Sequence, residues 1–393
     1  FFASRAPDTD GSNLARWIAE PQALAQLEVT LADGRRVTIG TGSDWAVTEG
    51  PTTYDGVYSG ESYDARRATE LTGWTEPGFD ADATGWRPAT VLDGPGGRLE
   101  PYVGEPIRTG KVVRPVRVTS PTDGVRVYDF GVVMSGWVRL RGDLPAGTTV
   151  RLLHSEKLGP SGRIEPGIPG GNENPAIDGR FQVDEYTAAG RGEESWHPSF
   201  TYKGFRYVEV TGTTQPLDIA AVPVGNDVAT TMALHLDHPV LQWIVDAVRQ
   251  TTGNGMQGHP VVSSMFTKVG WTLNTYRASQ PMLYQFGMAN VFATWLDDLA
   301  LSQASDGEIP LIAPQGETSG GFLLTPSSTG VYPSLVRRYW LTYGDKTIPE
   351  KHFAGVRSYI EWLLGKLTDG IADDQFGDWY PPRPEVNPQA PEG

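Results

Sequence analysis

Four side chains suited to acid–base chemistry or charge stabilisation lie close together in residues 259–287, which read HPVVSSMFTKVGWTLNTYRASQPMLYQFG. They are His259, Asn274, Tyr276 and Arg277, and the same stretch contains no aspartate or glutamate. Such a set could serve β-elimination from a uronic acid, in which Arg or Asn neutralises the substrate carboxylate and Tyr or His removes the acidified proton. In the alternative interpretation these are ordinary residues of a pocket without chemistry of its own.

Helical sequence surrounds this stretch and would position those side chains. A first apolar stripe with helical spacing runs through residues 238–254. Its members are Val240, Leu241, Ile244, Val245 and Val248. Similar stripes recur in residues 289–303, 331–344 and 352–367, separated by long loops rich in Gly and Pro. This pattern predicts helix pairs that form part of an (α/α)6 toroid over residues 228–393.

Two β modules are predicted before the helices, in residues 1–112 and 113–227. Residues 27–42 alternate apolar and polar side chains around Asp33-Gly34, which is a strong hairpin signal. Short strands joined by long loops predict a jelly-roll-like β-sandwich in the first module. Alternating runs between Gly-rich turns predict a second β-sandwich in the next.

Aromatic residues of the first module could form a sugar-stacking surface, because aromatic rings match the apolar faces of pyranose rings. The candidates are Tyr54, Tyr58, Tyr63, Trp74 and Trp86. For each of them, packing under loops in a core is the favoured interpretation, and carbohydrate binding by this module is the alternative. His154 and Glu156, at the end of a predicted strand, invite a catalytic interpretation, although polar residues at strand ends are more often structural.

Composition and charge exclude several classes of partner. The chain has 393 residues, of which 39% are hydrophobic, and this length allows two or three ordered domains. Its formal net charge of −15 argues against nucleic acid or an anionic membrane as partner, and no apolar run has membrane-spanning length. Because there is no cysteine, disulfides and thiolate metal sites are excluded. We expect a soluble protein, cytoplasmic or secreted, with no metal or cofactor, and a natural chain that extends beyond both Phe1 and Gly393.

The order of these modules, together with several short segments, resembles bacterial α-L-rhamnosidases of glycoside hydrolase family 78 almost from end to end. In the β half the segments are YSGESYDAR (58–66), GWRPA (85–89), DFGVVMSGWVRLR (129–141), PAGTTVRLLHSEKL (145–158) and SFTYKGFRYVEVTG (199–212). In the helical half they are HPVLQWIVDAV (238–248), GW (270–271), SDGEIP (305–310) and FGDW (376–379). Each segment is weakly specific alone, but their common order makes the resemblance strong.

The resemblance implies inverting hydrolysis of terminal α-L-rhamnosides by a pair of carboxyl groups. The family signature reads approximately Asp-Cys-Pro-Gln-Arg-Asp-Glu-Arg-x-Gly-Trp-x-Gly-Asp, and Gly270-Trp271 matches its Gly-Trp. Its acidic positions then fall on Val261, Phe266, Thr267 and Asn274. A further family acid falls near Ser327, and the family's general base is expected beyond Gly393. Since loss of one general acid or base typically costs about 10²–10⁴-fold in rate, the standard reaction lacks its usual groups here.

Three functions therefore stay open. The first is hydrolysis with other acids, for which Glu308, Glu317, Asp373, Asp374 and Asp378 are available. The second is sugar binding without turnover, and the third is a lyase reaction on rhamnose–uronate linkages. The catalytic candidates are Asp378, His259, Tyr276 and Arg277, and the substrate-binding candidates are Trp271, Asn274 and Trp379.

Overall fold

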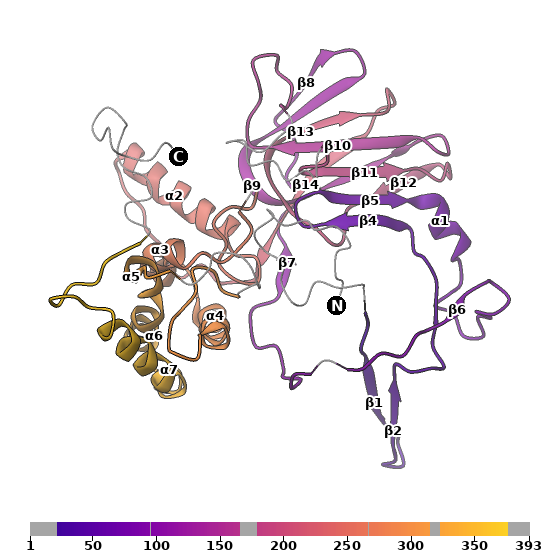
Figure 1. Cartoon of the computed structure of the whole chain (residues 1–393). Helices are drawn as coiled ribbons and strands as arrows, with labels where there is room; N and C mark the ends of the chain where they lie inside the picture. Colours follow the sequence, from indigo (N-terminus) through magenta and orange to yellow (C-terminus); the bar gives the residue numbers. More distant parts are fainter. Residues whose placement is uncertain (1–21, 95, 166–178, 266, 315–322, 376–393) are drawn as a thin grey trace. The chain divides into compact units, whose positions relative to one another are not determined.

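The computed structural model describes residues 22–94, 96–165, 179–265, 267–314 and 323–375. The chain divides into two compact units. One unit comprises residues 1–102, 108–225 and 264–266, and the other comprises residues 103–107, 226–263 and 267–393. Strands dominate the first unit and helices the second (Figure 1).

The first unit is built on a 10-stranded sheet with the order β4-β5-β11-β10-β13-β9-β14-β7, in which β8 and β12 also pair with β9. The strands are β4 (Thr52–Gly56), β5 (Gly60–Asp64), β7 (Ile107–Thr109), β8 (Arg117–Thr122), β9 (Val125–Asp143), β10 (Thr149–Ser155), β11 (Val183–Thr187), β12 (Glu193–Trp196), β13 (Lys203–Thr211) and β14 (Asp218–Asn226). With 19 residues, β9 is long enough to pair with β8 and β13 at one end and with β12 and β14 at the other. Strands β4 and β5, from the first predicted module, thus join the sheet of the second.

The remaining local elements of this unit are small. They are β1 (Gln26–Thr30), β2 (Arg36–Gly40), β3 (Ala46–Val47), β6 (Arg87–Pro88) and the one-turn helix α1 (Ala65–Glu70). The hairpin predicted at Asp33-Gly34 is confirmed, because β1 and β2 pair antiparallel across it. Gly34 has a φ of 84°, a left-handed conformation that glycine adopts without a steric penalty.

The core of the first unit takes alternate side chains from its strands, as the period of a β-strand requires. Val138 and Leu140 of β9 are buried, together with Val208 and Val210 of β13. Of the five aromatic candidates, Tyr63 stacks on Tyr186 with ring centroids 6.1 Å apart. Tyr58 is also buried, and the ring of Tyr54 lies under the guanidinium of Arg180. Trp74 and Trp86 contact each other near the surface.

The second unit contains six helices in the described part of the chain. They are α2 (Pro239–Asn254), α3 (Thr272–Gln285), α4 (Ala289–Ser302), α5 (Pro326–Thr329), α6 (Val331–Tyr343) and α7 (Thr347–Leu364). The apolar sides of α3, α4, α6 and α7 form one core. It includes Trp295, Leu299, Tyr332, Leu335 and Tyr359. The predicted fold class, β-sandwiches followed by part of an (α/α)6 toroid, is therefore confirmed.

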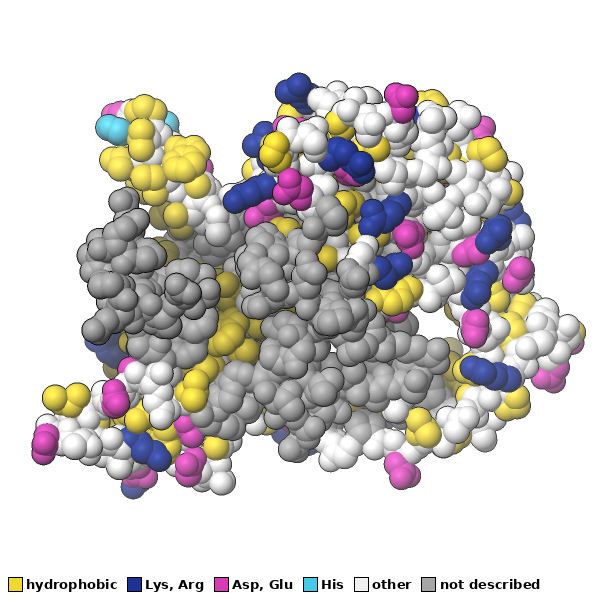
Figure 2. Space-filling model, turned by 45° about the horizontal axis from the view of Figure 1, so that its top comes forward, with side chains coloured by type: hydrophobic (Ala, Val, Ile, Leu, Met, Phe, Trp, Pro, Cys, Tyr) yellow, Lys and Arg dark blue, Asp and Glu magenta, His cyan; other side chains and the backbone are white. Residues whose placement is uncertain are grey.

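Two helices show how sequence patterns relate to burial. Helix α2 forms where its apolar stripe predicts, but none of its residues is buried against the described residues, and Trp243 is 68% exposed. Figure 2 shows apolar side chains gathered over this helix. Helix α3, for which no separate stripe is predicted, accommodates Pro281 although proline removes one backbone donor.

Candidate functional site

Gly270 and Trp271 are held against the loop that follows α4. The amide of Ala313 donates a hydrogen bond to Gly270 O (3.0 Å), and Trp271 forms an antiparallel bridge with Ile312. The indole Nε1 of Trp295 donates to Ala313 O at 3.0 Å. A Cβ on residue 270 would lie 2.2 Å from that same oxygen, so the close approach of the two segments requires glycine. The Gly-Trp pair thus forms a fixed platform.

Trp271 also serves as the N-cap residue of α3. Both the amide and the hydroxyl of Thr272 donate to Leu311 O, at 2.8 and 2.9 Å, and this locks the first turn of the helix onto the same loop. The side chain of Trp271 is partly exposed, and Asn274 in the first turn is exposed. An aromatic face and a nearby exposed amide are groups that can contact a sugar.

His259 lies beside this platform. Its ring Cδ2 is 3.1 Å from the position that a Cβ on Gly270 would occupy. Burial lowers the pKa of His259 to about 4, so the imidazole is neutral at pH 7. A neutral imidazole can accept or donate a hydrogen bond to a hydroxyl, but it cannot act as an imidazolium acid near neutral pH.

Tyr276 and Arg277 point in different directions. Tyr276 packs toward α5 and α6, where the guanidinium of Arg338 lies 5.4 Å from its ring centroid and Arg338 Nη1 donates to its carbonyl at 2.9 Å. Arg277 is exposed. Consecutive residues of a helix are separated by about 100° of rotation, and therefore these two side chains do not converge on one sugar ring. This geometry does not favour the lyase alternative.

Asp374 contacts Ser327, the residue near which the resemblance expects an acid. Its Oδ2 accepts a hydrogen bond from the amide of Ser327 at 3.1 Å, across 47 residues of sequence. The next residue, Gln375, donates its amide to Leu324 O (2.8 Å) and accepts from Leu324 N through Oε1 (2.9 Å). These three hydrogen bonds fix the segment that carries Asp374 at the start of α5.

Tyr359 of α7 lies near the same position. The Tyr359 hydroxyl lies 3.0 Å from Thr329 Oγ1. Burial raises the pKa of Tyr359, and the proximity of Tyr276 and Asp374 raises it further. Asp374, Tyr276 and Tyr359 therefore lie in one neighbourhood of the helical unit, which joins α3, α5 and α7.

The other acids proposed for hydrolysis differ in their surroundings. Glu308 is partly buried, and burial, with a smaller contribution from Asp306, raises the pKa of its carboxyl. Asp373 is exposed. Three predicted residues lie outside the described residues and stay predictions: Glu317, Asp378 and Trp379.

Sequence reasoning overlooked Asp298. Burial, and secondarily the adjacent Asp297, raise the pKa of this carboxyl to about 6. A carboxyl that titrates in this range can exchange a proton near neutral pH, as general acids do. It lies on α4 three residues after Trp295, and the signal that could have revealed it is a pair of adjacent carboxylates in an otherwise apolar helix.

The motif positions form a narrow loop. The amide of Ser263 donates to Thr267 O at 3.0 Å, so the chain turns back on itself between these two residues. Val261, Thr267 and Asn274, which stand at acidic positions of the family signature, carry no carboxyl group, and Phe266 lies outside the described residues. The described part of the motif therefore has no acid of its own.

His154 and Glu156 belong to the β unit. The side chain of His154 is fully buried, and its Nδ1 lies 3.0 Å from Gln182 O. Glu156 is partly buried, and burial raises its pKa. Because His154 is inaccessible to solvent, the structural interpretation fits it better than the catalytic one.

Among the described residues, no group of three or more His, Asp or Glu side chains could hold a metal ion. Within the same ranges, no helix is long and apolar enough to cross a membrane.

Models of three rhamnosidase domains match the chain in succession. Residues 1–111 match the alpha-L-rhamnosidase N-terminal domain, residues 119–225 the bacterial alpha-L-rhamnosidase concanavalin-like domain, and residues 229–392 the bacterial alpha-L-rhamnosidase 6 hairpin glycosidase domain. An alpha-L-rhamnosidase from Streptomyces avermitilis is 33% identical over 366 residues, which is 91% of this chain and 34% of that protein. The chain belongs to the bacterial α-L-rhamnosidase family.

Solved rhamnosidase structures are similar in fold to most of this chain. The Streptomyces avermitilis alpha-L-rhamnosidase complexed with L-rhamnose has a TM-score of 0.83 at 30% identity, over 94% of this chain and 36% of that one. The alpha-L-rhamnosidase from Dictyoglumus thermophilum has a TM-score of 0.81 at 26% identity, over 89% of this chain and 38% of that one. The chain spans 34% to 40% of the length of the curated rhamnosidases that it matches.

Proposed function

We propose that this rhamnosidase-family protein acts on carbohydrates that end in α-L-rhamnose, and that Asp374 supplies a carboxylate of its sugar site. The observation that supports the proposal is the hydrogen bond from the Ser327 amide to Asp374, because it brings a carboxylate beside the residue near which the resemblance expects an acid. The rhamnose bound to the Streptomyces avermitilis relative supports the choice of sugar.

The chemistry would follow the inverting scheme. One carboxylic acid protonates the leaving oxygen, and a carboxylate about 6.5–9.5 Å away activates water on the opposite face of the sugar. Asp374 accepts a backbone hydrogen bond through a carboxyl oxygen, and this acceptor geometry suits the role of base or of hydroxyl acceptor. Asp378 remains our proposal for a second acid of the same segment, and Trp379 for a sugar contact.

Trp271 would form the apolar wall of the site, and Asn274 and His259 would contact sugar hydroxyls. The closeness of His259 to the Gly270-Trp271 platform supports this grouping. Tyr276, which shares a neighbourhood with Asp374, would orient that carboxylate and not act as a base. Arg277, exposed on α3, would contact a sugar unit beyond the terminal rhamnose.

We further propose that function is divided among three parts of the chain. Residues 1–112 would form an N-terminal β-sandwich with a possible carbohydrate-binding role, residues 113–227 a second β-sandwich, and residues 228–393 the first part of the catalytic-type toroid. The succession of three family models with similar ranges supports this division.

The test is turnover of an aryl α-L-rhamnoside by the full-length protein, compared between Asp374→Asn and Asp373→Asn. The neighbour Asp373 is exposed and is a matched control. We expect the Asp374 variant to lose about 10²–10⁴-fold in kcat, while the Asp373 variant keeps the wild-type rate. Equal rates for both variants would remove Asp374 from the proposal.

Sugar binding without turnover is the second candidate, and one observation favours it: the described motif residues carry no carboxyl group. Calorimetry with L-rhamnose would detect such binding in a protein that releases no aryl alcohol. A triple replacement, Val261→Asp with Thr267→Glu and Asn274→Asp, should then raise turnover above background, because it returns acids to the positions of the family signature. No increase in a triple variant that still binds rhamnose would argue against a retained catalytic geometry.

A further inference from the structure

The backbone amide and carbonyl of Gly204, on one edge of β13, are both hydrogen-bonded to a glutamine side chain. Strand β10 pairs with β13 only as far as Ser155 opposite Tyr207, so no strand of that side reaches Gly204. There the carboxamide of Gln182 accepts from Gly204 N (2.9 Å) and donates to Gly204 O (2.9 Å). The Gln182 side chain thus continues the ladder in place of a strand.

Gln182 is itself firmly held. It is fully buried, its amide donates to Tyr58 O at 2.8 Å, and its Nε2 also donates to His154 O at 3.2 Å. Its backbone has a φ of 55°, which is uncommon for a residue other than glycine. A buried residue keeps such a conformation only where its surroundings determine it, and these hydrogen bonds do so.

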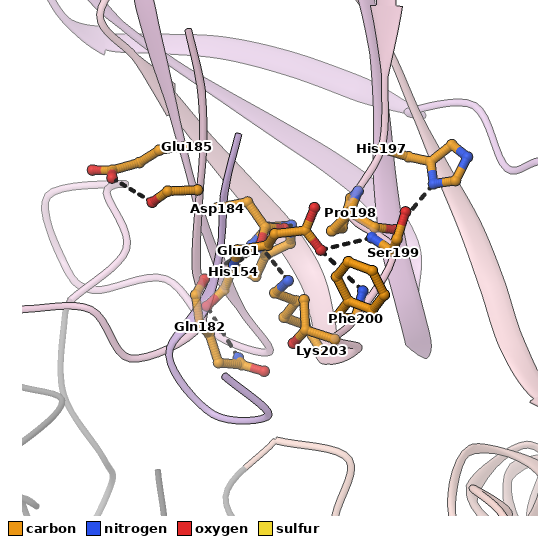
Figure 3. A network of polar contacts seen from close by, with 12 residues as sticks. Glu61, His154, Gln182, Asp184, Glu185, His197, Pro198, Ser199, Phe200 and Lys203 are labelled. Atoms are coloured by element: carbon orange, nitrogen blue, oxygen red, sulfur yellow. Dashed lines mark hydrogen bonds and ion pairs between the residues drawn. The ribbon is translucent and has the colours of Figure 1, made fainter. Parts of the chain in front are cut away.

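The residue before Gly204 belongs to a buried charged network, shown in Figure 3. Lys203 pairs with Asp184, whose Oδ1 also accepts the Glu61 amide at 2.9 Å. Glu61 Oε2 accepts the amides of Ser199 and Phe200 at 2.7 and 2.9 Å. The network therefore links β5, β11 and β13 with the segment before β13, and it leaves the Gly204 backbone little freedom to move.

On one face of the sheet, where a side chain would point, Gly204 lies against the tip of the motif loop. A Cβ placed there would lie 2.6 Å from Ser264 Oγ and 2.8 Å from Met265 N. Met265 is buried in a small cluster with Tyr58 and Phe181. Through these contacts, Ser264 and Met265 belong to the β unit.

We propose that Gln182 and Gly204 are positioning residues for the proposed sugar site, because they hold the loop tip that precedes the Gly270-Trp271 platform. The hydrogen bond from Ser263 N to Thr267 O closes the loop just behind its tip, so a fixed tip fixes Thr267 as well. Only two residues then separate Thr267 from Gly270. The role in sugar binding rests on the proposed function, whereas the hold on the loop does not.

Hydrogen exchange of the full chain tests the hold directly. Gly204→Ala should accelerate amide exchange in residues 261–269 by about fivefold or more, since overpacking costs at least about 1 kcal/mol and 1.4 kcal/mol corresponds to tenfold. Strand β9 should keep its wild-type exchange. Gly50→Ala is the matched control, because a Cβ at Gly50 meets nothing within 4 Å. Unchanged exchange in residues 261–269 of the Gly204 variant would overturn the proposal.

A second variant and a binding measurement separate a local effect on the loop from general unfolding and from failure of the proposed function. If Gly204→Ala also accelerates exchange in β9, Met265→Ala tests the same contact from the loop side, and it should loosen residues 261–269 alone. Loss of protection across β9 in this variant too would count against a local hold. In calorimetry with L-rhamnose, Gly204→Ala should weaken binding about tenfold and Gly50→Ala should not. If the wild type binds no rhamnose, the proposed function fails while the exchange result still decides the hold on the loop.

Discussion

Replacement of Lys203 by methionine should strongly destabilise the β unit. The side chains of Lys203 and Asp184 are 1% and 0% exposed, and they form a buried ion pair. Glu61, also buried, lies close enough for Asp184 and Lys203 to influence its pKa in opposite directions. Without the ammonium group, two buried carboxyl groups remain beside each other with no cation of their own.

The expected loss follows from this burial. Removal of one partner of a buried ion pair typically costs about 3–5 kcal/mol, because the other charge is left without compensation. For a unit of this size, 1 kcal/mol corresponds to a change in Tm of about 2–4 °C, so Lys203→Met should lower the Tm by roughly 6–20 °C. Asp184→Asn in the same chain should offset part of this loss, because the two residues are coupled.

Thermal unfolding followed by near-UV circular dichroism measures the effect, with Arg141→Met as the control. Arg141 pairs with Glu193 in the same large sheet, but these side chains are 52% and 59% exposed. An exposed pair contributes about 0–1 kcal/mol, so the control should shift the Tm by less than about 4 °C. A Lys203 variant that melts no lower than the Arg141 variant would refute the argument that burial makes this pair essential.

Three further predictions concern pH and exposure. The pKa of His259 is lowered to about 4, so the folded protein keeps this imidazole neutral while the unfolded chain binds a proton below pH 6.5. The stability of the protein should therefore fall between pH 6.5 and 4. In thermal melts over that range, the His259→Asn variant should lose less stability than the wild type. Burial raises the pKa of Glu61, so the contribution of this carboxyl to stability is favourable at low pH and is lost as the pH rises above 4.5. The Glu61→Gln variant can still accept the amides of Ser199 and Phe200. Its stability should therefore increase relative to that of the wild type between pH 4.5 and 7.5. Trp243→Gln on the exposed face of α2 should change the free energy of unfolding by less than about 0.5 kcal/mol, and a larger loss in urea titration would mean that this face is covered.

Local sequence was sufficient where the determining interactions are local. The hairpin at Asp33-Gly34 follows from a turn that needs a left-handed residue, and α6 ends at Gly344, which adopts the left-handed conformation with a φ of 69°. The helical stripes predicted α4, α6 and the greater part of α7 for the same reason, since their period is a property of a few consecutive turns. The order of short motifs also sufficed to indicate the family.

Periodicity alone could not say what covers an apolar face. The stripe of α2 is as regular as those of α4 and α6, yet only the latter are buried against other described residues. Burial depends on which elements pack together, and that is a property of the whole fold. Helix α3 is a second example, because it contains Pro281 and yet forms where it can pack against α5 and α6.

The sequence by itself determined the class of the fold, the family and the absence of acids from residues 259–287. Only the tertiary structure decided that Asp374 reaches Ser327 across 47 residues, and that Tyr276 and Arg277 diverge. The same holds for the contact of Gly204 with Ser264 and for the amides that Glu61 accepts 138 and 139 residues further along the chain. Such contacts depend on the path of the folded backbone, because distance along the sequence does not limit which side chains meet in a packed interior.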